Sequence, residues 1–235
     1  MATPEEGIPA IPEQYREQME KMIERMLADM QDESAWNFYS EKHGVKAYTK
    51  VDGALTAARG VGHIPYNPRA VWDLIMDVER KKTFDSQLAE GKRAKVLDAQ
   101  TNIDYLEYKS MFIVAGRDFV SLVHWRVLPG GTIVIVAQST EDLELCPLKE
   151  PKVVRGTIHI AGWKIIPDAD YKGCDVTFMV KTDLKGSIPS RVASKAAAEQ
   201  PYLIHELTQV LKKDKNLARF DAQGKLTNTI FETAP

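Results

Sequence analysis

The sequence is poor in cysteine and has neither a strong excess of one charge nor a long apolar run. Two cysteines among 235 residues, Cys146 and Cys174, are too few for a disulfide framework or a cysteine-rich metal site. A formal net charge of −2 provides no overall positive field for nucleic acid. No apolar run approaches the ~20 residues that span a bilayer. These absences favour a cytoplasmic protein that binds neither a metal nor nucleic acid.

Recognisable catalytic motifs are also missing. The sequence has no HExxH, GxSxG or phosphate-loop pattern, and no Cys-x-x-Cys pair. Among the five histidines, only His159 is a candidate catalytic base, and no nucleophile is evident beside it. The sequence therefore favours a protein that is not an enzyme and needs no cofactor.

The composition divides the chain into a short first segment, one domain and a tail. Residues 1–12 contain three prolines and few apolar anchors, so we expect them to be disordered. Residues 13–213 carry the periodic patterns of a single domain. The polar residues 214–235 are expected to form a loose tail.

Three segments have the periodicity of helices. Residues 13–30 present an apolar stripe at spacings of three and four, formed by Tyr15, Met19, Met22, Met26 and Met30. We expect this stripe to pack on the core, the alternative being an adaptable binding face. Asn67 and Pro68 have the residue types of a helix cap and a first helical position. A long helix is expected from about 188 to 213, with a kink at Pro201 and an inner stripe of Val192, Ala196, Gln200, Leu203, Leu207 and Val210.

The rest of the domain is typical of an antiparallel sheet. Two or three strands are expected within 34–68, followed by strands at 92–98, 102–111, 117–128, 131–140, 152–166 and 173–184. The last of these alternates apolar and polar residues, so one face meets water. The simplest solution is an α+β fold, in which a strongly curved sheet is closed by the long C-terminal helix around an apolar chamber.

Four segments carry a resemblance to a known family. They are "AWNFYSEKHGVKAYTK", "GRDFVSL", "KEPKVVRGTIHIAGWKIIP" and "TDLKGSIP", in this order. Together they resemble the StAR-related lipid-transfer (START) domain over roughly residues 30–213. The resemblance implies a helix-grip fold: a curved antiparallel sheet wrapped around a long C-terminal helix, enclosing an apolar tunnel. It also implies an intracellular lipid carrier. A helix-grip enzyme such as a cyclase or hydrolase, or a protein-interaction module, are the alternatives of other classes.

The same resemblance gives a role to the apolar run before "GRDF". It implies that residues 111–116 form a loop at the tunnel mouth, instead of the core strand that composition alone would favour. The residues expected to cap the tunnel and touch a membrane surface transiently are Met111, Phe112, Ile113 and Val114. Arg117 and Asp118, which follow, are expected to anchor the structure instead of contacting the ligand.

The resemblance leaves the identity of the lipid open. The segment "CPLKEPKVVRGTIHIAGWKI" is similar to the small soluble branch that carries sterols, so a sterol is favoured. A phospholipid is the alternative, because a basic residue for its phosphate would fall near residues 80–82. In the phosphatidylcholine branch of the family, three positions form an aromatic cage around the choline cation. These positions match Leu106, Phe119 and His159, of which Phe119 alone belongs to the Phe, Tyr and Trp types that form such a cage.

Strand alternation, in register with those positions, predicts which side chains point into the chamber. The strand residues expected to contact the lipid are Leu106, Tyr108, Phe119, Ser121, Val123, Trp125, Thr157 and His159, with Asp104 facing the same way. Leu203 and Leu207 join them from the last helix. The polar candidates for a lipid hydroxyl are Ser121, His159, Thr157 and Tyr108. We expect the protein to act as a monomer.

Overall fold

A computed structural model describes residues 13–110, 114–222 and 224–227. The expected disordered segment 1–12 and the first three residues of the expected lid, Met111 to Ile113, lie outside the described residues.

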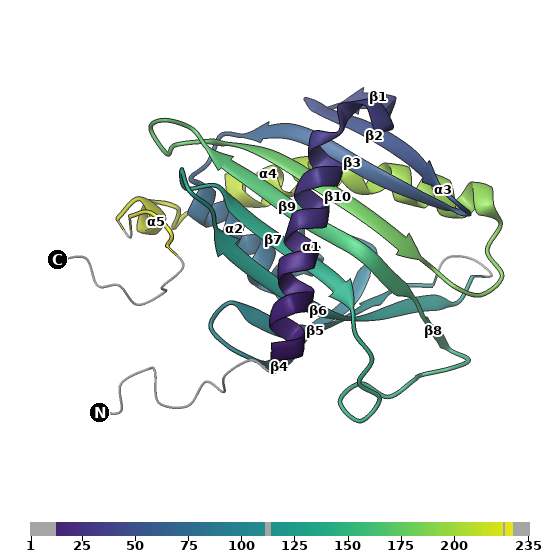
Figure 1. Ribbon diagram of the computed structural model, residues 1–235. Helices are drawn as coiled ribbons and strands as arrows, with labels where there is room; N and C mark the ends of the chain where they lie inside the picture. The colour runs from purple at the N-terminus through teal and green to yellow at the C-terminus, as the bar shows by residue number, and fades with distance from the viewer. Residues whose placement is uncertain (1–12, 111–113, 223, 228–235) are drawn as a thin grey trace, which may run out of the picture.

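The described strands form one ten-stranded, strongly curved sheet in the order β1-β2-β3-β10-β9-β7-β6-β5-β4 (Figure 1). Every neighbouring pair along this order is antiparallel, and the short β8 pairs with β6 in parallel. The strands are β1 (Asn37–Lys42), β2 (Val45–Asp52), β3 (Leu55–Ile64), β4 (Leu88–Val96), β5 (Thr101–Tyr108), β6 (Gly116–Val127), β7 (Ile133–Ser139), β8 (Val153–Arg155), β9 (Thr157–Pro167) and β10 (Cys174–Asp183).

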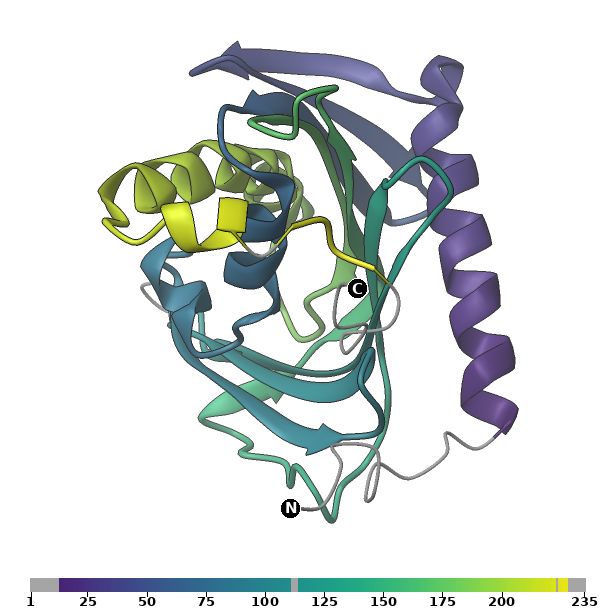
Figure 2. The same cartoon turned by 90° about the vertical axis from the view of Figure 1, so that its left-hand side faces the viewer.

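Helices cover both faces of this sheet. In Figure 2 the purple α1 lies on the convex face, while the yellow-green C-terminal helices and α2 lie within the concave side. The helices are α1 (Glu13–Gln31), α2 (Pro68–Met76), α3 (Ser190–Glu199), α4 (Leu203–Lys213) and α5 (Ala218–Ala222), with 3-10 turns η1 (Glu33–Ala35), η2 (Arg80–Thr83) and η3 (Gln200–Tyr202).

Local chemistry sets the boundaries of α2 and of the C-terminal helices. The Asn67 side chain accepts a hydrogen bond from the Arg69 amide at 2.9 Å, and Pro68 occupies the first position of α2, as the sequence predicts. The expected interruption at Pro201 is also present, because η3 separates α3 from α4. A proline lacks the amide donor that a continuous helix needs at that point.

Each face of the sheet has its own core. On the convex face, Met22, Met26 and Met30 of α1 pack against sheet residues such as Val134 and Met179. The methionine stripe is therefore a packing surface, as predicted. On the concave face, a larger cluster joins the sheet to α2 and α4 and includes Leu74, Ile75, Trp125, Trp163, Phe178, Ile204, Leu207 and Leu211.

The inner stripe predicted for the C-terminal helix is wrong in its first half. Val192 is 47% exposed and Ala196 is also exposed, whereas Ala198 is buried. The interruption at η3 changes the helix face that meets the sheet. It is possible because β3 has a glycine there: a Cβ on Gly60 would lie 2.7 Å from the Cβ of Pro201.

The loose tail predicted from residue 214 is likewise not observed in its described part. Residues 218–222 form α5, and the Phe220 side chain is 3% exposed within the concave core. Arg219 lies 3.4 Å from Asp214 and 3.9 Å from Asp73 of α2. One buried ring and these ion pairs outweigh the polar composition that suggested a loose segment.

Candidate functional site

The concave face of β5 and β6 gathers most of the side chains expected to meet a lipid. Val123 and Trp125 both belong to the concave side, because they pack with the core beneath α2 and α4. Residues two apart on a strand share a face, so Ser121 and Phe119 lie on that side as well. Their register partners on β5 are Asp104 for Ser121 and Leu106 for Phe119. Alternation predicted these orientations, while contact with a lipid stays a prediction.

Several of these inward residues keep part of their surface uncovered by protein. Leu106, Tyr108, Val123 and Leu203 are half-buried, although they lie on the side of the sheet covered by helices. Leu207 differs, because it is completely buried within the packed concave core. The face therefore changes along its length, from a filled core near Leu207 to side chains with free surface.

A half-buried tyrosine and a buried aspartate form a polar pair at the end of β5. The Tyr108 hydroxyl is hydrogen-bonded to the Asp85 carboxylate, and the Phe119 ring lies edge-on to the Tyr108 ring at 5.8 Å. Burial raises the pKa of Tyr108 well above its ordinary value and also raises the pKa of Asp85. The Tyr108 hydroxyl is therefore neutral at neutral pH and can form hydrogen bonds with a ligand without carrying a charge.

Two basic side chains approach the same end of the face. Arg93 donates to Asp104 at 3.1 Å and to the Met76 carbonyl at 2.7 Å. The Lys81 ammonium donates to the Ile75 carbonyl at 2.5 Å. Burial lowers the pKa of Lys81, and the carboxylate of Asp104 opposes that change. The positive charges here are thus partly balanced by carboxylates.

One donor on α2, which packs on the concave face, lacks a partner within the described part of the chain. The indole nitrogen of Trp72, on α2, is buried and finds no acceptor among the described residues. Its ring packs edge-on against Trp125 with the centroids 4.8 Å apart. A buried donor without a partner costs about 1–3 kcal/mol, so this N–H group is available to an acceptor atom of a ligand.

Two predicted contacts, Thr157 and His159, do not have the inward orientation that alternation predicts. The pairing of β9 with β10 shifts at this point: Ile160 lies opposite Lys181, but Ile158 lies opposite Thr182. His159 is therefore an extra residue, and this β-bulge reverses the alternation of the residues before it. Ile158 takes the inward position, and His159 lines a pocket on the convex face. A bulge depends on the partner strand, so the sequence of β9 alone did not reveal it.

Arg117 and Asp118 act as structural anchors in the way that the sequence suggested. The Arg117 guanidinium donates to the carbonyls of Leu184 and Lys185, each at 3.0 Å, and also to the Ala115 carbonyl. It thereby ties the end of the 111–116 segment to the turn before α3. Asp118 accepts two hydrogen bonds from Arg155, at 2.8 and 3.0 Å. Val114, the one described residue of the expected lid, is half-buried.

Sequence reasoning did not identify Trp72, Asp85 or Arg93 as site residues. Trp72 fitted the apolar face of a helix, and its unpaired nitrogen becomes evident only from the packing around it. Asp85 is hydrogen-bonded to Tyr108 and Arg93 to Asp104, and in each case the partner belongs to another element of the fold. Lys81 does fall within the 80–82 range in which a basic residue was sought.

A family profile described as the START domain matches residues 15–204. The chain belongs to the START domain family. The curved antiparallel sheet with its C-terminal helix is accordingly the helix-grip fold of that family.

Solved START structures support the same fold. Human StAR-related lipid transfer protein 5 superposes with a TM-score of 0.78 at 24% identity, covering 86% of this chain and 99% of that one. Human STARD10 gives a TM-score of 0.75 at 20% identity, covering 94% and 88%. At these identities the likeness establishes architecture and not cargo.

Sequence relatives are distant and longer. START domain-containing protein 10 of Mus musculus is 23% identical over 177 residues, which are 72% of this START chain and 58% of the relative. Rho GTPase-activating protein 7 of Bos taurus is 25% identical over 180 residues, which make up only 16% of that protein. The GTPase-activating role in its name therefore does not transfer with the match. Within the described residues, no helix is both long and apolar enough to cross a membrane.

Proposed function

We propose that this START protein carries one lipid molecule at a time between membranes, and that the lipid is a sterol or a similarly rigid apolar molecule. The observation that carries the proposal is the set of half-buried inward residues on β5 and β6, which offer uncovered apolar surface beneath the helices. In this proposal the protein works as a monomer in the cytoplasm and touches membranes transiently. It acts as a carrier and catalyses no reaction.

Apolar contact can supply enough affinity for such a cargo. Burial of about 400 Å² of sterol surface at ~25 cal/mol/Å² is worth about 10 kcal/mol before ordering costs. Leu106, Tyr108 and Val123 offer uncovered surface for these contacts. Area alone gives little selectivity, so the polar groups on the same face must distinguish one lipid from another.

The polar groups suit a ligand that has a single hydroxyl. The Tyr108 and Ser121 hydroxyls can exchange hydrogen bonds with an alcohol without creating a buried charge. The free Trp72 donor offers a second place for an oxygen atom. An alcohol that found no partner would lose about 1–3 kcal/mol, which makes these groups the basis of selectivity.

A phospholipid is the second candidate because of one observation, the enclosed ammonium group of Lys81. Its lowered pKa reflects burial, and a lipid phosphate would provide the counter-charge that favours the ammonium form. Asp104 and Asp85 already oppose the effect of burial there, so the positive charge is partly balanced without a ligand. This partial balance is why the sterol is preferred.

Transfer between liposomes tests both candidates. Donor vesicles carry either a fluorescent sterol or a fluorescent phosphatidylcholine, and transfer to acceptor vesicles is compared with the rate without protein. We expect sterol transfer well above that rate, a several-fold loss in Tyr108→Phe and little change in Lys81→Met. If phosphatidylcholine alone is transferred and Lys81→Met abolishes its transfer, the phospholipid candidate replaces the sterol. If folded protein transfers neither lipid, the carrier proposal fails.

A further inference from the structure

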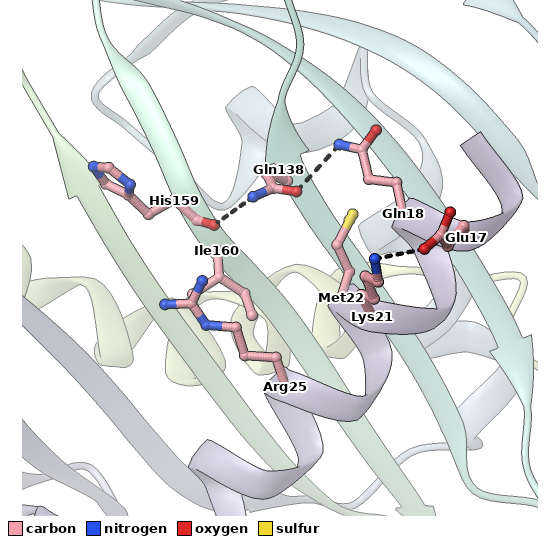
Figure 3. Close-up of a pocket in the computed structure, with 8 residues that line it drawn as sticks. All are labelled: Glu17, Gln18, Lys21, Met22, Arg25, Gln138, His159 and Ile160. Atoms are coloured by element: carbon pink, nitrogen blue, oxygen red, sulfur yellow. Dashed lines mark hydrogen bonds and ion pairs between the residues drawn. The ribbon is translucent and has the colours of Figure 1, made fainter. Parts of the chain in front are cut away.

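A pocket lies on the convex face of the sheet, between α1 and strands β7 and β9 (Figure 3). It has a volume of about 370 Å³, within the range of small-molecule sites. We call it the α1 pocket, and its lining residues are Glu17, Gln18, Lys21, Met22, Arg25, Gln138, His159 and Ile160. The sheet separates it from the concave face proposed to hold the lipid.

The pocket exists because the sheet opens along one seam. The ladder between β7 and β9 runs from Ile133 to Ala137 on β7 and stops there. Beyond it, the Gln138 side chain donates to the His159 carbonyl at 3.3 Å and accepts from Gln18 of α1 at 3.1 Å. Side-chain hydrogen bonds therefore replace the backbone ladder next to the His159 bulge. This arrangement leaves a recess beneath α1.

The floor of the α1 pocket is apolar and its rim is charged. Met22 and Ile160 are 4% and 2% exposed and belong to the convex core. On the rim, Lys21 is neutralised by Glu17, whose carboxylate lies 2.6 Å from the Lys21 ammonium. A ligand here would meet an apolar surface at one end and charged groups at the other.

Arg25 is the rim cation whose charge is least satisfied. Its described carboxylate contact, with Asp29, spans 4.0 Å, and Asp29 lies closer to Lys50, at 3.2 Å. The Arg25 side chain is 52% exposed, and Figure 3 shows its guanidinium directed towards Ile160. A guanidinium in this setting can bind a carboxylate or a phosphate through two parallel hydrogen bonds.

His159 has further basic groups in its surroundings. Burial lowers the pKa of His159, and the charges of Lys181, Lys185 and Arg25 lower it further, against the opposing charge of Asp183. The imidazole is therefore neutral at neutral pH and can still donate one hydrogen bond. Lys181 is paired with Asp52 and Lys185 with Asp183, so Arg25 has the weakest carboxylate contact among these cations.

We propose that the α1 pocket binds a small amphiphile with one carboxylate or phosphate group, whose acidic group pairs with Arg25 and whose apolar part lies on Met22 and Ile160. The ligand would bind on the opposite side of the sheet from the proposed cargo. The inference therefore stands whether or not the protein carries a lipid.

Methionine methyl NMR of the full chain tests this proposal. Protein labelled at the methionine methyl groups is titrated with decanoate or decyl phosphate below their micelle concentrations, and with decanol or inorganic phosphate as controls. The reporter is the Met22 methyl signal, assigned with Met22→Leu, while Met30, on the same helix stripe but outside the pocket lining, serves as the internal reference. Arg25→Gln tests the ion pair, and Arg16→Gln, an exposed arginine on the same helix, is the matched control.

We expect a saturable shift of the Met22 signal with decanoate, decyl phosphate or both, and at least tenfold weaker binding in Arg25→Gln but not in Arg16→Gln. The stronger of the two probes identifies the acidic group. Decanol and inorganic phosphate should each bind at least tenfold more weakly than the amphiphile. The proposal is overturned if neither amphiphile moves the Met22 signal, if Arg25→Gln binds as well as the wild type, or if either control binds as well as the amphiphiles.

Discussion

At the scale of single residues, burial determines which groups carry charge. His124 on β6 is 5% exposed, and Thr101 lies 2.9 Å from its Nδ1. Burial, assisted by the nearby charge of Arg126, lowers the pKa of His124 from 6.5 to about 4. Arg126 itself is held by Glu20 of α1 at 2.7 Å. One buried histidine thus makes the junction between α1 and the sheet sensitive to acid.

The resulting prediction concerns stability against pH. The unfolded chain takes up a proton on His124 near pH 6.5, whereas the folded chain resists it until about pH 4. The contribution of neutral His124 to the free energy of unfolding is therefore fully present above pH 6.5. As the pH falls from 6.5 to 4, this contribution decreases by about 3 kcal/mol. We expect His124→Gln, which can keep a hydrogen bond to Thr101, to lose less stability than the wild type between pH 7 and 4.5.

Urea unfolding midpoints at several pH values measure this difference. His63→Gln serves as the control, because His63 is a half-exposed histidine outside this junction, where it contacts Asp168. A decline in His124→Gln as steep as that of the wild type would contradict the assignment.

At the scale of elements, the close approach of β3 to η3 decides where the C-terminal helices lie. A Cβ on Gly60 would lie 2.7 Å from the Cβ of Pro201 and 3.0 Å from its Cα. Side chains at Gly62 would meet the ends of Ile204 and Val45 at 3.2 and 3.3 Å, and these side chains can move. The two glycine positions of β3 therefore differ in how well they would tolerate an added methyl group.

We predict that Gly60→Ala destabilises the protein by about 1–3 kcal/mol, because the added methyl group pushes η3 away from the sheet. The matched variant Gly62→Ala should lose clearly less. Urea unfolding measures both values, and hydrogen exchange should show earlier opening of α3 and α4 in Gly60→Ala. Equal losses, or a larger loss in Gly62→Ala, would show that this approach does not hold the helices in place.

At the scale of the whole molecule, the sheet separates two faces that differ in chemistry. The concave face joins α2 and α4 to the sheet and holds the proposed lipid contacts, while the convex face holds α1 and its pocket. Arg117 connects the segment before β6 to the turn before α3. A cargo that touches both sheet and helix would therefore stabilise elements far apart in the sequence.

This leads to a prediction about thermal stability. A ligand at a hundred times its Kd stabilises the folded state by about 2.7 kcal/mol, which raises Tm by roughly 5–10 °C for a chain of this size. We expect this rise on adding sterol to the wild type and not to Ser121→Trp, whose indole would fill the inward position. Circular dichroism must first show that Ser121→Trp is folded. Equal rises in both proteins would place the cargo elsewhere.

Much of the fold follows from local patterns. The Asn67–Pro68 helix start, the interruption at Pro201 and the methionine stripe of α1 are all confirmed. On the candidate site, alternation correctly orients the residues of β5 and β6. Alternation could not identify Asp85 or Trp72 as site residues. Asp85 is distinguished by its hydrogen bond to Tyr108 on another element, and Trp72 by a buried nitrogen that finds no partner among the described residues.

By itself, the sequence of this protein determined the helices, the strands and the alternating faces, because these depend on residues a few positions apart. Only the tertiary structure decided that His159 lies on the convex face of the sheet, that Val192 is exposed and that Phe220 is buried. Each of these outcomes depends on a distant partner: the register of β10 against β9, the approach of β3 to η3, and the room left beside α2 and α4. Periodicity describes one segment at a time, whereas burial is set by whatever segment packs against it.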